Sequence, residues 1–344
     1  MTNASNETSV PLVSVIILNY NGLKFAEQCV RSVLQSDYPN LEVVIVDNAS
    51  TDGSYELLYR SFGSIPSVRI LRNSRNTGFA EGNNVGYNNS KGDVLVFLNI
   101  DTRVERRWLS ELVRALRAEN VGGAQSKIMS LRDPRRVESV GHDIDWLGFV
   151  YSRPLHWAFA PIDHVQQLFY PEGASMAYKR AVLEEVCLAE GPFDSEYFFY
   201  FEDNDLGWRI RLRGYSIILV LPSVAYHYVA GSGSPAFRYA GTFSFSKNRM
   251  MTLTKNYGLR NLVWILPLAV LLEIFRAILL SVREPTRSLA KLMALLWWLR
   301  NLHKVWKKRV FVQSYIRKIP DSELMRHMLS PNFARLRRSF DKLY

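Results

Sequence analysis

Short apolar runs alternate with helical segments from Val13 to Leu98, and this alternation limits the possible folds more than any other feature of the sequence. The apolar runs are rich in β-branched residues, which is typical of strands buried on both faces. They cover residues 13–18, 41–46, 68–71 and 93–98, and the helical segments between them cover 23–35, 52–62 and 79–89. Strands connected by helices predict an α/β fold with a mostly parallel, Rossmann-like, doubly wound sheet and helices on both faces.

The pattern changes beyond Glu105. Residues 121–170 are rich in glycine, proline and aromatic side chains, which predicts strands joined by long loops. Around this region we expect helices over 105–119 and 179–186, another helix after Glu202, and a strand over 215–221.

The net charge of +11 is concentrated at one end of the chain. Residues 1–254 carry a net charge of −2, whereas residues 255–344 carry +13. A near-neutral body with a basic end is typical of a globular domain with a surface-binding appendage. We therefore expect a disordered N-terminus (1–11), a globular domain (12–250) and a basic, amphipathic helical region that associates with an anionic membrane surface (251–344).

The 21 residues from Leu262 to Val282 are mostly apolar. Five charged residues in and after this stretch would form one polar stripe if the helix continued: Glu273, Arg276, Arg283, Arg287 and Lys291. Such a stripe favours a helix that lies in the membrane interface. Two alternatives remain open, namely a helix packed on the protein's own core and a single membrane span, for which about 20 apolar residues suffice.

The N-terminus and the cysteines favour a cytoplasmic location. Residues 1–11 lack the positive charge and the apolar core of a secretory signal, and the chain has only two cysteines. We expect a peripheral or monotopic protein on the cytoplasmic side of the cell membrane.

Polar residues or glycines follow each of the first four strands. They are Asn19 and Asn21, then Asp47 and Asn48, then Arg75, Asn76, Gly78, Gly82 and Asn83, and finally Asn99 and Asp101. Open α/β sheets bind ligands beyond the carboxyl ends of their parallel strands. Each residue alone can be explained as part of a turn or a helix cap, but four such strand ends together indicate a binding site.

These segments resemble the motifs of the family 2 glycosyltransferases. The matching stretches are Val13–Asn21, Val46–Gly53, Asn76–Asn84 and Leu98–Thr102. The resemblance covers residues 12–250 and looks nearest to the rhamnosyltransferase-like branch of the family. It implies a catalytic domain of GT-A fold that transfers a sugar from a nucleoside diphosphate donor with inversion.

The resemblance also assigns the residues that bind the donor. Asp47 would contact the nucleoside, and Arg75 and Asn76 would reach the base or the phosphates. The glycines at 78 and 82 would let the backbone approach the nucleotide closely. Gly173 and Ala174 match a small-residue turn beside the donor sugar and the acceptor. The other expected donor-binding residues are Asn19, Asn21, Asn48, Asn83 and Asn99.

The metal motif of the family is usually Asp-x-Asp, and this chain has Asn99-Ile100-Asp101 in that place. Asp101 would bind Mg²⁺ or Mn²⁺, Asn99 would be a weak or sugar-side ligand, and His227 matches a ligand of the metal or the diphosphate. A hard divalent cation supplies the positive charge that a departing diphosphate needs. The alternative is that Asp101 caps the following helix.

An inverting transfer needs a base that deprotonates the acceptor hydroxyl. The segment Glu202–Arg209 resembles the family's Glu-Asp-x-Asp motif, which assigns the base to Asp203 with Glu202 as its rival. The simpler interpretation is a helix N-terminus in which Asp205 pairs with Arg209 one turn later. Both interpretations can hold together.

The sequence therefore predicts a metal-dependent hexosyltransferase that moves rhamnose or another hexose from a dTDP- or UDP-sugar to a glycan or lipid-linked acceptor. The rival enzyme is a sugar nucleotidyltransferase, but such enzymes carry a glycine-rich loop with Arg and Lys where this chain has Asn19–Lys24. The non-enzymatic alternative is a basic membrane- or nucleic-acid-binding module. Long aliphatic runs between the basic residues favour a membrane over a nucleic acid.

Overall fold

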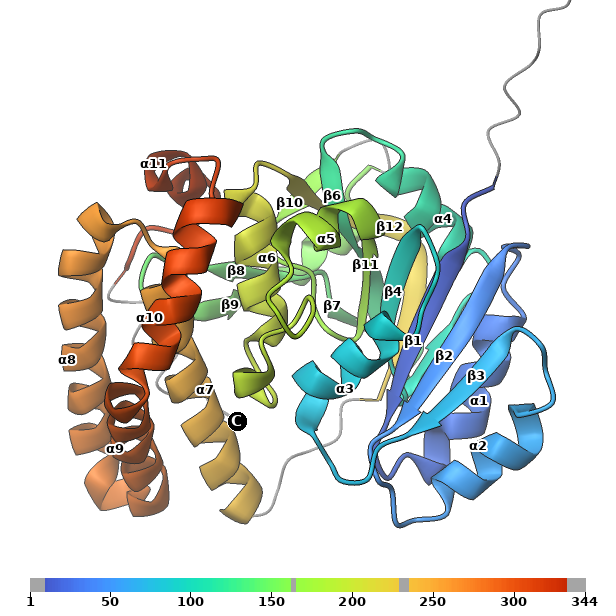
Figure 1. The fold of residues 1–344 in the computed structure, drawn as a ribbon, viewed down its shortest axis with the longest axis horizontal. Helices are drawn as coiled ribbons and strands as arrows, with labels where there is room; N and C mark the ends of the chain where they lie inside the picture. The colour runs from blue at the N-terminus through green and yellow to red at the C-terminus, as the bar shows by residue number, and fades with distance from the viewer. Residues whose placement is uncertain (1–9, 162–164, 229–234, 333–344) are drawn as a thin grey trace, which may run out of the picture.

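The computed structural model describes residues 10–161, 165–228 and 235–332. A ten-stranded sheet forms the centre, and a bundle of C-terminal helices packs against one side (Figure 1). Residues 1–9 of the expected disordered N-terminus lie outside the described part of the chain.

The four strands expected in the first half of the chain all form, and they pair in parallel in the order β4-β1-β2-β3. The elements are β1 (Val13–Asn19), α1 (Leu23–Leu34), β2 (Leu41–Asp47), α2 (Ser54–Phe62), β3 (Val68–Arg72), α3 (Gly78–Asn88) and β4 (Val94–Asn99). The register places Asn19 opposite Asp47, and Leu18 opposite Asn99. The carboxyl ends of these strands therefore meet at one edge of the sheet.

The second half of the chain extends the sheet beyond β4. These strands are β5 (Thr102–Val104), β6 (Val121–Ser130), β7 (Val137–Ser139), β10 (Gln166–Leu168), β11 (Ser175–Lys179) and β12 (Ser216–His227), and a separate pair is β8 (His142–Ile144) with β9 (Val150–Ser152). β11 is antiparallel to both β4 and β6. β12 runs past the expected end at 221 to pair with β5, so that His227 lies opposite Thr102 and next to Asp101.

Side chains that alternate along β1 build two cores, one on each face of the sheet. Val15 and Ile17 pack with α1, α2 and α4 (Trp108–Leu116), whereas Ile16 faces the core that contains α3, α5 (Arg180–Val186) and α6 (Glu202–Leu212). The C-terminal helices join this second core.

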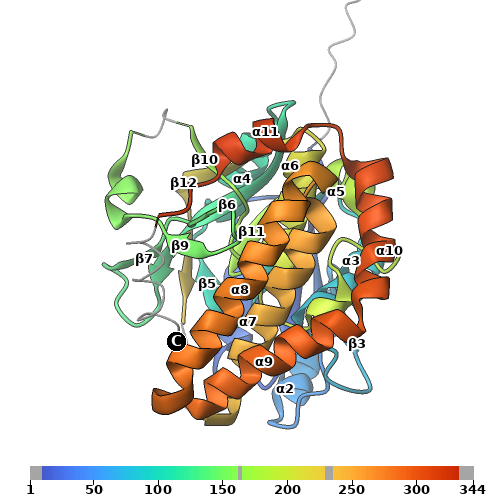
Figure 2. The same ribbon diagram turned by 90° about the vertical axis from the view of Figure 1, so that its left-hand side faces the viewer.

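The C-terminal helices begin before the expected domain boundary, because residue 250 lies inside α7 (Pro235–Asn256). The elements that follow are α8 (Leu259–Arg283), α9 (Pro285–Arg300), α10 (Leu302–Phe311), a π-helical turn (Val312–Ile316) and α11 (Asp321–Leu324). Four short 3₁₀ or π turns, including Ser195–Tyr197 before α6, complete the described elements. Figure 2 shows α8 and α9 lying side by side as a hairpin.

The expected continuous polar stripe is wrong. The helix breaks at Glu284 because Pro285 starts a new helix that turns back. Four of the five charged residues are buried, and they are Glu273, Arg276, Arg287 and Lys291. Only Arg283 is exposed.

Candidate active site

Two adjoining cavities open at the carboxyl edge of the parallel strands. The strand-end cavity, of about 490 Å³, is lined by Asn21, Asn48, Asn76, Gly78 and Asp101 among others. The α6 cavity, of about 600 Å³, is lined by residues that include His142, Glu172, Gly173, Glu202, Asp203 and His227. Both cavities share the side chains of Phe79, Asn99, Phe199 and Phe237, so they form one continuous site.

Asn48 organises the wall of the strand-end cavity. Its Nδ2 donates to Asn76 Oδ1 at 2.9 Å and to the carbonyl of Gly78 at 3.1 Å, and its Oδ1 accepts from the backbone N–H of Thr77 at 3.0 Å. The side chain ties the end of β2 to the loop that enters α3. Seven of the residues expected to bind the donor line one or both cavities: Asn21, Asn48, Asn76, Gly78, Asn99, Gly173 and Ala174.

Asn19 and Asp47 are not among the residues that line the two cavities, contrary to expectation. Both are fully buried, and Asn19 Nδ2 donates to Asp47 Oδ1 at 2.7 Å. The other oxygen of Asp47 accepts from the backbone N–H of Ser50 at 3.1 Å and lies 3.5 Å from Arg72 Nε. These contacts use both oxygens of the carboxylate, so Asp47 shapes the turn that presents Asn48.

Three further residues that were expected to bind the donor also line neither cavity. A Cβ at Gly82 would lie 2.4 Å from Leu18 Cδ1, so this glycine permits close packing of α3 on β1. Asn83 is buried and donates to the carbonyl of Phe79 within the same helix. Arg75 is exposed and is not among the residues that line either cavity.

Asp101 and His227 form the part of the site that suits a cation. His227 Nε2 lies 3.2 Å from Asp101 Oδ1 and 3.5 Å from Asn99 Nδ2. Burial opposes the charged imidazolium, but the hydrogen bond and the charge of Asp101 raise the pKa of His227 above its ordinary value. The residue after Asp101 begins a strand, and α4 starts only at Trp108, so Asp101 does not cap a helix.

The donor atoms fit a divalent cation that takes its remaining ligands from a substrate. Within the described ranges no three His, Cys, Asp or Glu side chains converge as a complete metal site. One carboxylate, one imidazole and one amide oxygen are nevertheless ligands that Mn²⁺ accepts. The buried Nδ1 of His227 has no partner among the described residues.

Asp203 projects into the α6 cavity from the first turn of α6. Its Oδ2 accepts from the backbone N–H of Gly173 at 3.2 Å, and its Oδ1 accepts from that of Asn204 at 2.7 Å. Burial raises the pKa of Asp203 to about 6, which the Asn204 N–H opposes and the charge of Glu172 reinforces. A carboxylate with this pKa is ionised at neutral pH and is a stronger base than an exposed one.

The neighbouring carboxyl of Glu202 lies in an environment that disfavours its charged form more strongly. Burial and the charge of Asp203 raise the pKa of Glu202 well above its ordinary value, which favours the neutral acid. Its buried Oε2 has no partner in the described part of the chain. The geometry therefore favours Asp203 over Glu202 as a base.

The loop before α6 is held in an unusual conformation by a residue that the sequence analysis missed. Phe198, Tyr200 and Phe201 have φ values of 59°, 67° and 71°, which are costly for side chains other than glycine. Asn248 Nδ2 on α7 donates to the carbonyls of Tyr197 at 2.9 Å, Phe199 at 3.0 Å and Tyr200 at 2.6 Å. The sequence feature that could have pointed to Asn248 is the polar run Ser246–Arg249 within α7.

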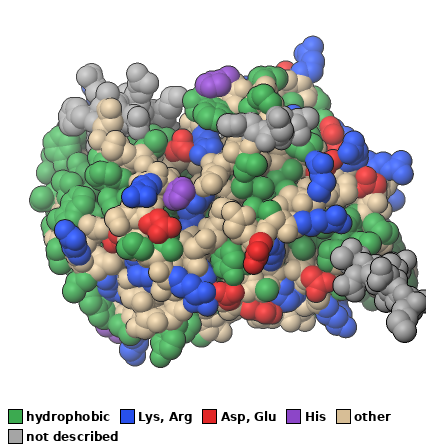
Figure 3. Space-filling model, turned by 90° about the horizontal axis from the view of Figure 1, so that it is seen from above, with side chains coloured by type: hydrophobic (Ala, Val, Ile, Leu, Met, Phe, Trp, Pro, Cys, Tyr) green, Lys and Arg blue, Asp and Glu red, His purple; other side chains and the backbone are tan. Residues whose placement is uncertain are grey.

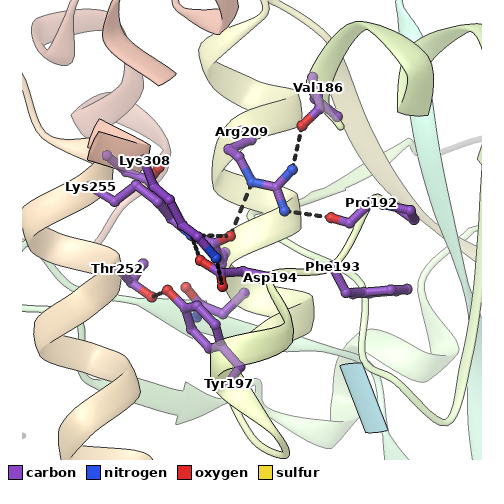
Figure 4. A network of polar contacts seen from close by, with 12 residues as sticks. Val186, Pro192, Phe193, Asp194, Tyr197, Arg209, Thr252, Lys255 and Lys308 are labelled. Atoms are coloured by element: carbon purple, nitrogen blue, oxygen red, sulfur yellow. Dashed lines mark hydrogen bonds and ion pairs between the residues drawn. The ribbon is translucent and has the colours of Figure 1, made fainter. Parts of the chain in front are cut away.

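A buried network of ion pairs anchors the other side of α6 (Figure 4). Asp205 pairs with Arg209 at 3.0 Å, as the sequence predicts, and also with Lys255 of α7 at 2.9 Å. Lys255 contacts Asp194 at 2.6 Å, and Lys308 of α10 contacts the same carboxylate at 2.5 Å. Although burial opposes ionisation, the lysines and Arg209 hold the pKa of both carboxyls below the ordinary value.

A family model described as "Glycosyl transferase family 2" matches residues 14–186, which is half of the chain. The chain belongs to this family. The glycosyltransferase is 31% identical to AglE of Haloferax volcanii over 116 residues, which are 33% of this chain and 38% of the relative. It is 33% identical to TuaG of Bacillus subtilis, named as a putative teichuronic acid biosynthesis glycosyltransferase, over 29% of this chain and 40% of the relative.

The matches to curated relatives are partial. An uncharacterized protein of Sinorhizobium fredii is 28% identical over 64% of this chain but only 25% of its own length. For the first three relatives the glycosyltransferase spans between 25% and 38% of the relative.

Solved structures confirm the GT-A fold. A mannosyltransferase from Pyrobaculum calidifontis in complex with GDP-Man and Mn²⁺ superposes with a TM-score of 0.55 at 22% identity and covers 89% of this chain and 86% of its own. GalNAc-T7 with UDP, GalNAc and Mn²⁺ gives a TM-score of 0.60 at 18% identity, over 72% of this chain and 48% of its own. TarS of S. aureus in complex with UDP gives 0.54 at 16% identity, over 88% of this chain and 91% of its own.

Proposed function

We propose that this glycosyltransferase is an inverting, cation-assisted hexosyltransferase that moves a sugar from a nucleoside diphosphate donor to a glycan or lipid-linked acceptor at a membrane. The observation that carries the proposal is that two carboxylates line adjoining cavities of one continuous site. Asp203 lies in the α6 cavity, Asp101 lines the strand-end cavity, and Asn99 contributes to both. The nucleotide-sugars bound in two solved neighbours, GDP-Man and UDP-GlcNAc, support a nucleotide-sugar donor.

The strand-end cavity is the place for the nucleoside diphosphate in this proposal. Asn48 and Asn76 offer amide groups, and the backbone at Gly78 approaches the cavity without a side chain. The ring of Tyr20, which is half exposed, offers a stacking surface for a base at the rim.

Asp203 acts as the general base. Its carboxylate accepts the proton of the acceptor hydroxyl while the acceptor oxygen forms a bond to C1 of the donor sugar. The bond between C1 and the diphosphate oxygen breaks on the opposite side of the ring, and its electron pair leaves with the nucleoside diphosphate. The configuration at C1 of the sugar is inverted, and the proton of the acceptor hydroxyl ends on Asp203.

Asp101 and His227, with Asn99 beside them, are the residues that would hold Mg²⁺ or Mn²⁺. The cation supplies positive charge to the departing diphosphate. Manganese in two solved neighbours supports this assignment.

The α6 cavity suits a hydroxylated acceptor. His142 Nδ1 and Glu172 Oε2 lie 3.8 Å apart on its wall, and both side-chain polar atoms of Asn204 are buried without a partner among the described residues. Buried polar atoms of this kind are satisfied by a ligand or by water. A resemblance to the rhamnosyltransferase-like branch makes dTDP-rhamnose the first donor to test, followed by UDP-sugars.

The decisive experiment is a panel of nucleotide sugars incubated with the full chain, with and without Mg²⁺ or Mn²⁺, followed by product analysis. Release of a nucleoside diphosphate from one donor, dependent on the cation and lost in Asp203→Asn, is expected. Release of pyrophosphate instead would identify a sugar nucleotidyltransferase and contradict the proposal.

A further inference from the structure

The α8–α9 hairpin presents an apolar face to solvent along its whole length. The exposed side chains of α8 recur every three or four residues and include Val263, Leu271, Ile278 and Val282, the last of which is 89% exposed. Leu289 and Leu299 continue the face on α9. Figure 3 shows hydrophobic side chains crowded along the edge where Figure 1 places α8. A helix of 25 residues is about 37 Å long, so the exposed apolar residues form a strip of about that length. Extended exposed apolar surface of this kind marks an interaction site.

Four charged residues of the hairpin point the other way, into the protein: Glu273, Arg276, Arg287 and Lys291. Glu273 of α8 is fully buried and contacts Arg249 of α7 at 2.6 Å and Lys291 of α9 at 2.9 Å. The hydroxyl of Ser246 on α7 completes the cluster at 3.1 Å from Glu273. These contacts fix which face of α8 looks outward.

We propose that this outward face lies in the surface of an anionic lipid bilayer, with α8 and α9 parallel to the membrane plane. α8 alone is long and apolar enough to cross a membrane among the described helices. A crossing orientation would take Glu273 and its ion-pair partners into the hydrocarbon core, where charged groups are costly. An in-plane orientation leaves the cluster inside the protein and immerses only apolar side chains.

The charges around the apolar face favour a lipid surface over a second copy of the chain as its partner. Arg260, Arg283 and Arg300 are exposed at the ends of the two helices, and Lys304 and Lys307 follow on α10. From Leu259 to Arg300 the acidic residues are Glu273, which is buried, and Glu284, which pairs with Arg287 at 2.8 Å. Two copies packed through this face would bring like charges together, whereas anionic headgroups complement them.

The face also lies close to the active site. Phe237 and Phe245 of α7 line the α6 cavity, and Arg249 of the same helix contacts Glu273 of α8. One helix therefore separates the cavity from the proposed lipid surface. This last link rests on the proposed function, but the membrane contact itself does not.

Flotation of the full chain with phosphatidylcholine vesicles, with and without phosphatidylglycerol, tests the contact. The unmodified chain is expected to float with the anionic vesicles. The double variant Leu271→Asp with Ile278→Asp is expected to reduce the bound fraction at least tenfold. The matched control places the same charges at two exposed apolar residues outside the hairpin, Phe159→Asp with Val165→Asp, and is expected to float normally.

Three outcomes would overturn the proposal. They are equal flotation of the hairpin variant and the unmodified chain, absence of flotation for both, and a lipid-free dimer that the hairpin variant converts to a monomer. Circular dichroism and thermal unfolding confirm that each variant is folded. Release of nucleoside diphosphate by the same samples separates the two proposals, because a folded variant that turns over donor without binding vesicles leaves the proposed function intact.

Depth measurements distinguish the in-plane orientation from a span. A fluorophore is attached through Val263→Cys, Leu271→Cys or Val282→Cys in a chain with Cys187→Ser, since Cys29 is fully buried. Lipid-borne quenchers are expected to report similar shallow depths at all three positions. A deep central position between two shallow ends would show a span and contradict the proposal.

Discussion

Two carboxylates on the same helix have opposite properties: Asp203 is partly buried and lines the α6 cavity, whereas Asp205 is fully buried. Burial raises the pKa of Asp203 to about 6, whereas Lys255 and Arg209 hold the pKa of Asp205 below its ordinary value against the effect of burial. Among the described residues, Asp203 accepts only from backbone N–H groups, whereas Asp205 is bound by two cationic side chains and by Asn256. The difference shows that partners, more than burial, separate a carboxylate available for chemistry from one that holds the fold.

The largest expected effect comes from Asp203→Asn. Removal of a general base lowers kcat by about 10²- to 10⁴-fold, while the amide keeps the size of the side chain and leaves the nucleotide cavity intact. We expect nucleotide affinity, measured by calorimetry, to change little. The matched control is Glu202→Gln, which retains more activity because that carboxyl favours its neutral form. Turnover retained by Asp203→Asn and lost by Glu202→Gln would reverse the assignment of the base.

Lys255→Met tests whether Asp205, the second carboxylate of the comparison, stabilises the fold through its ion pairs. It leaves the buried carboxylates of Asp194 and Asp205 without a shared cation, and breaking a buried ion pair in this way costs about 3–5 kcal/mol of unfolding free energy. Denaturant titration at neutral pH measures the loss. The same change at the exposed Lys304 is the control and is expected to cost less than about 0.5 kcal/mol. Equal stabilities of the two variants would show that the network contributes little.

Asn248→Ala tests whether the loop before Asp203 needs its clamp. The substitution removes three hydrogen bonds to backbone carbonyls, and we expect a fall in kcat of about tenfold, since 1.4 kcal/mol corresponds to that factor. The KM for the donor is expected to change less, because Asn248 lies outside the strand-end cavity. Asn301→Ala, which removes a hydrogen bond within the C-terminal helices, serves as the control. An unchanged kcat with lowered stability would mean that the clamp is purely structural.

The smallest expected effect is a pH dependence that separates the two carboxylates. The base must be deprotonated, so activity is expected to fall to half at about pH 6 and by up to tenfold for each further unit of acidity. Asp205 has a lowered pKa, so its contribution to stability is present above the unfolded value and is lost only as the pH falls through the lower folded value. Activity should therefore fail before the fold does. Coincident loss of turnover and of near-ultraviolet circular dichroism would contradict this order.

The sequence predicts the first half of the sheet closely because its signals are local. Strand patterns and turn residues placed all four parallel strands, and the strand-end rule brought Asn48, Asn76 and Gly78 to one cavity. The rule does not distinguish a side chain that lines a cavity from one that supports it. Asp47 and Asn19 illustrate this, since they line neither cavity and bond to each other 28 residues apart in the sequence, while Asp47 also accepts from the N–H of Ser50.

The C-terminal helices were harder to predict because helical spacing gives no sign of which face is buried. Glu273 and Lys291 read as a solvent-facing stripe, yet their partners lie on other helices, and a break at Glu284 reverses the chain between them. Asn248 was missed because its acceptors are backbone carbonyls, which carry no mark in the sequence.

The dependence of the catalytic loop on α7 limits how members of this family can be recombined. A chimera that joins the sheet of this chain to the C-terminal helices of another would inherit Phe198–Phe201 without the amide that holds their carbonyls. Exchange of acceptor preference by grafting therefore requires moving residues 194–209 and 246–256 together, as one inherited unit.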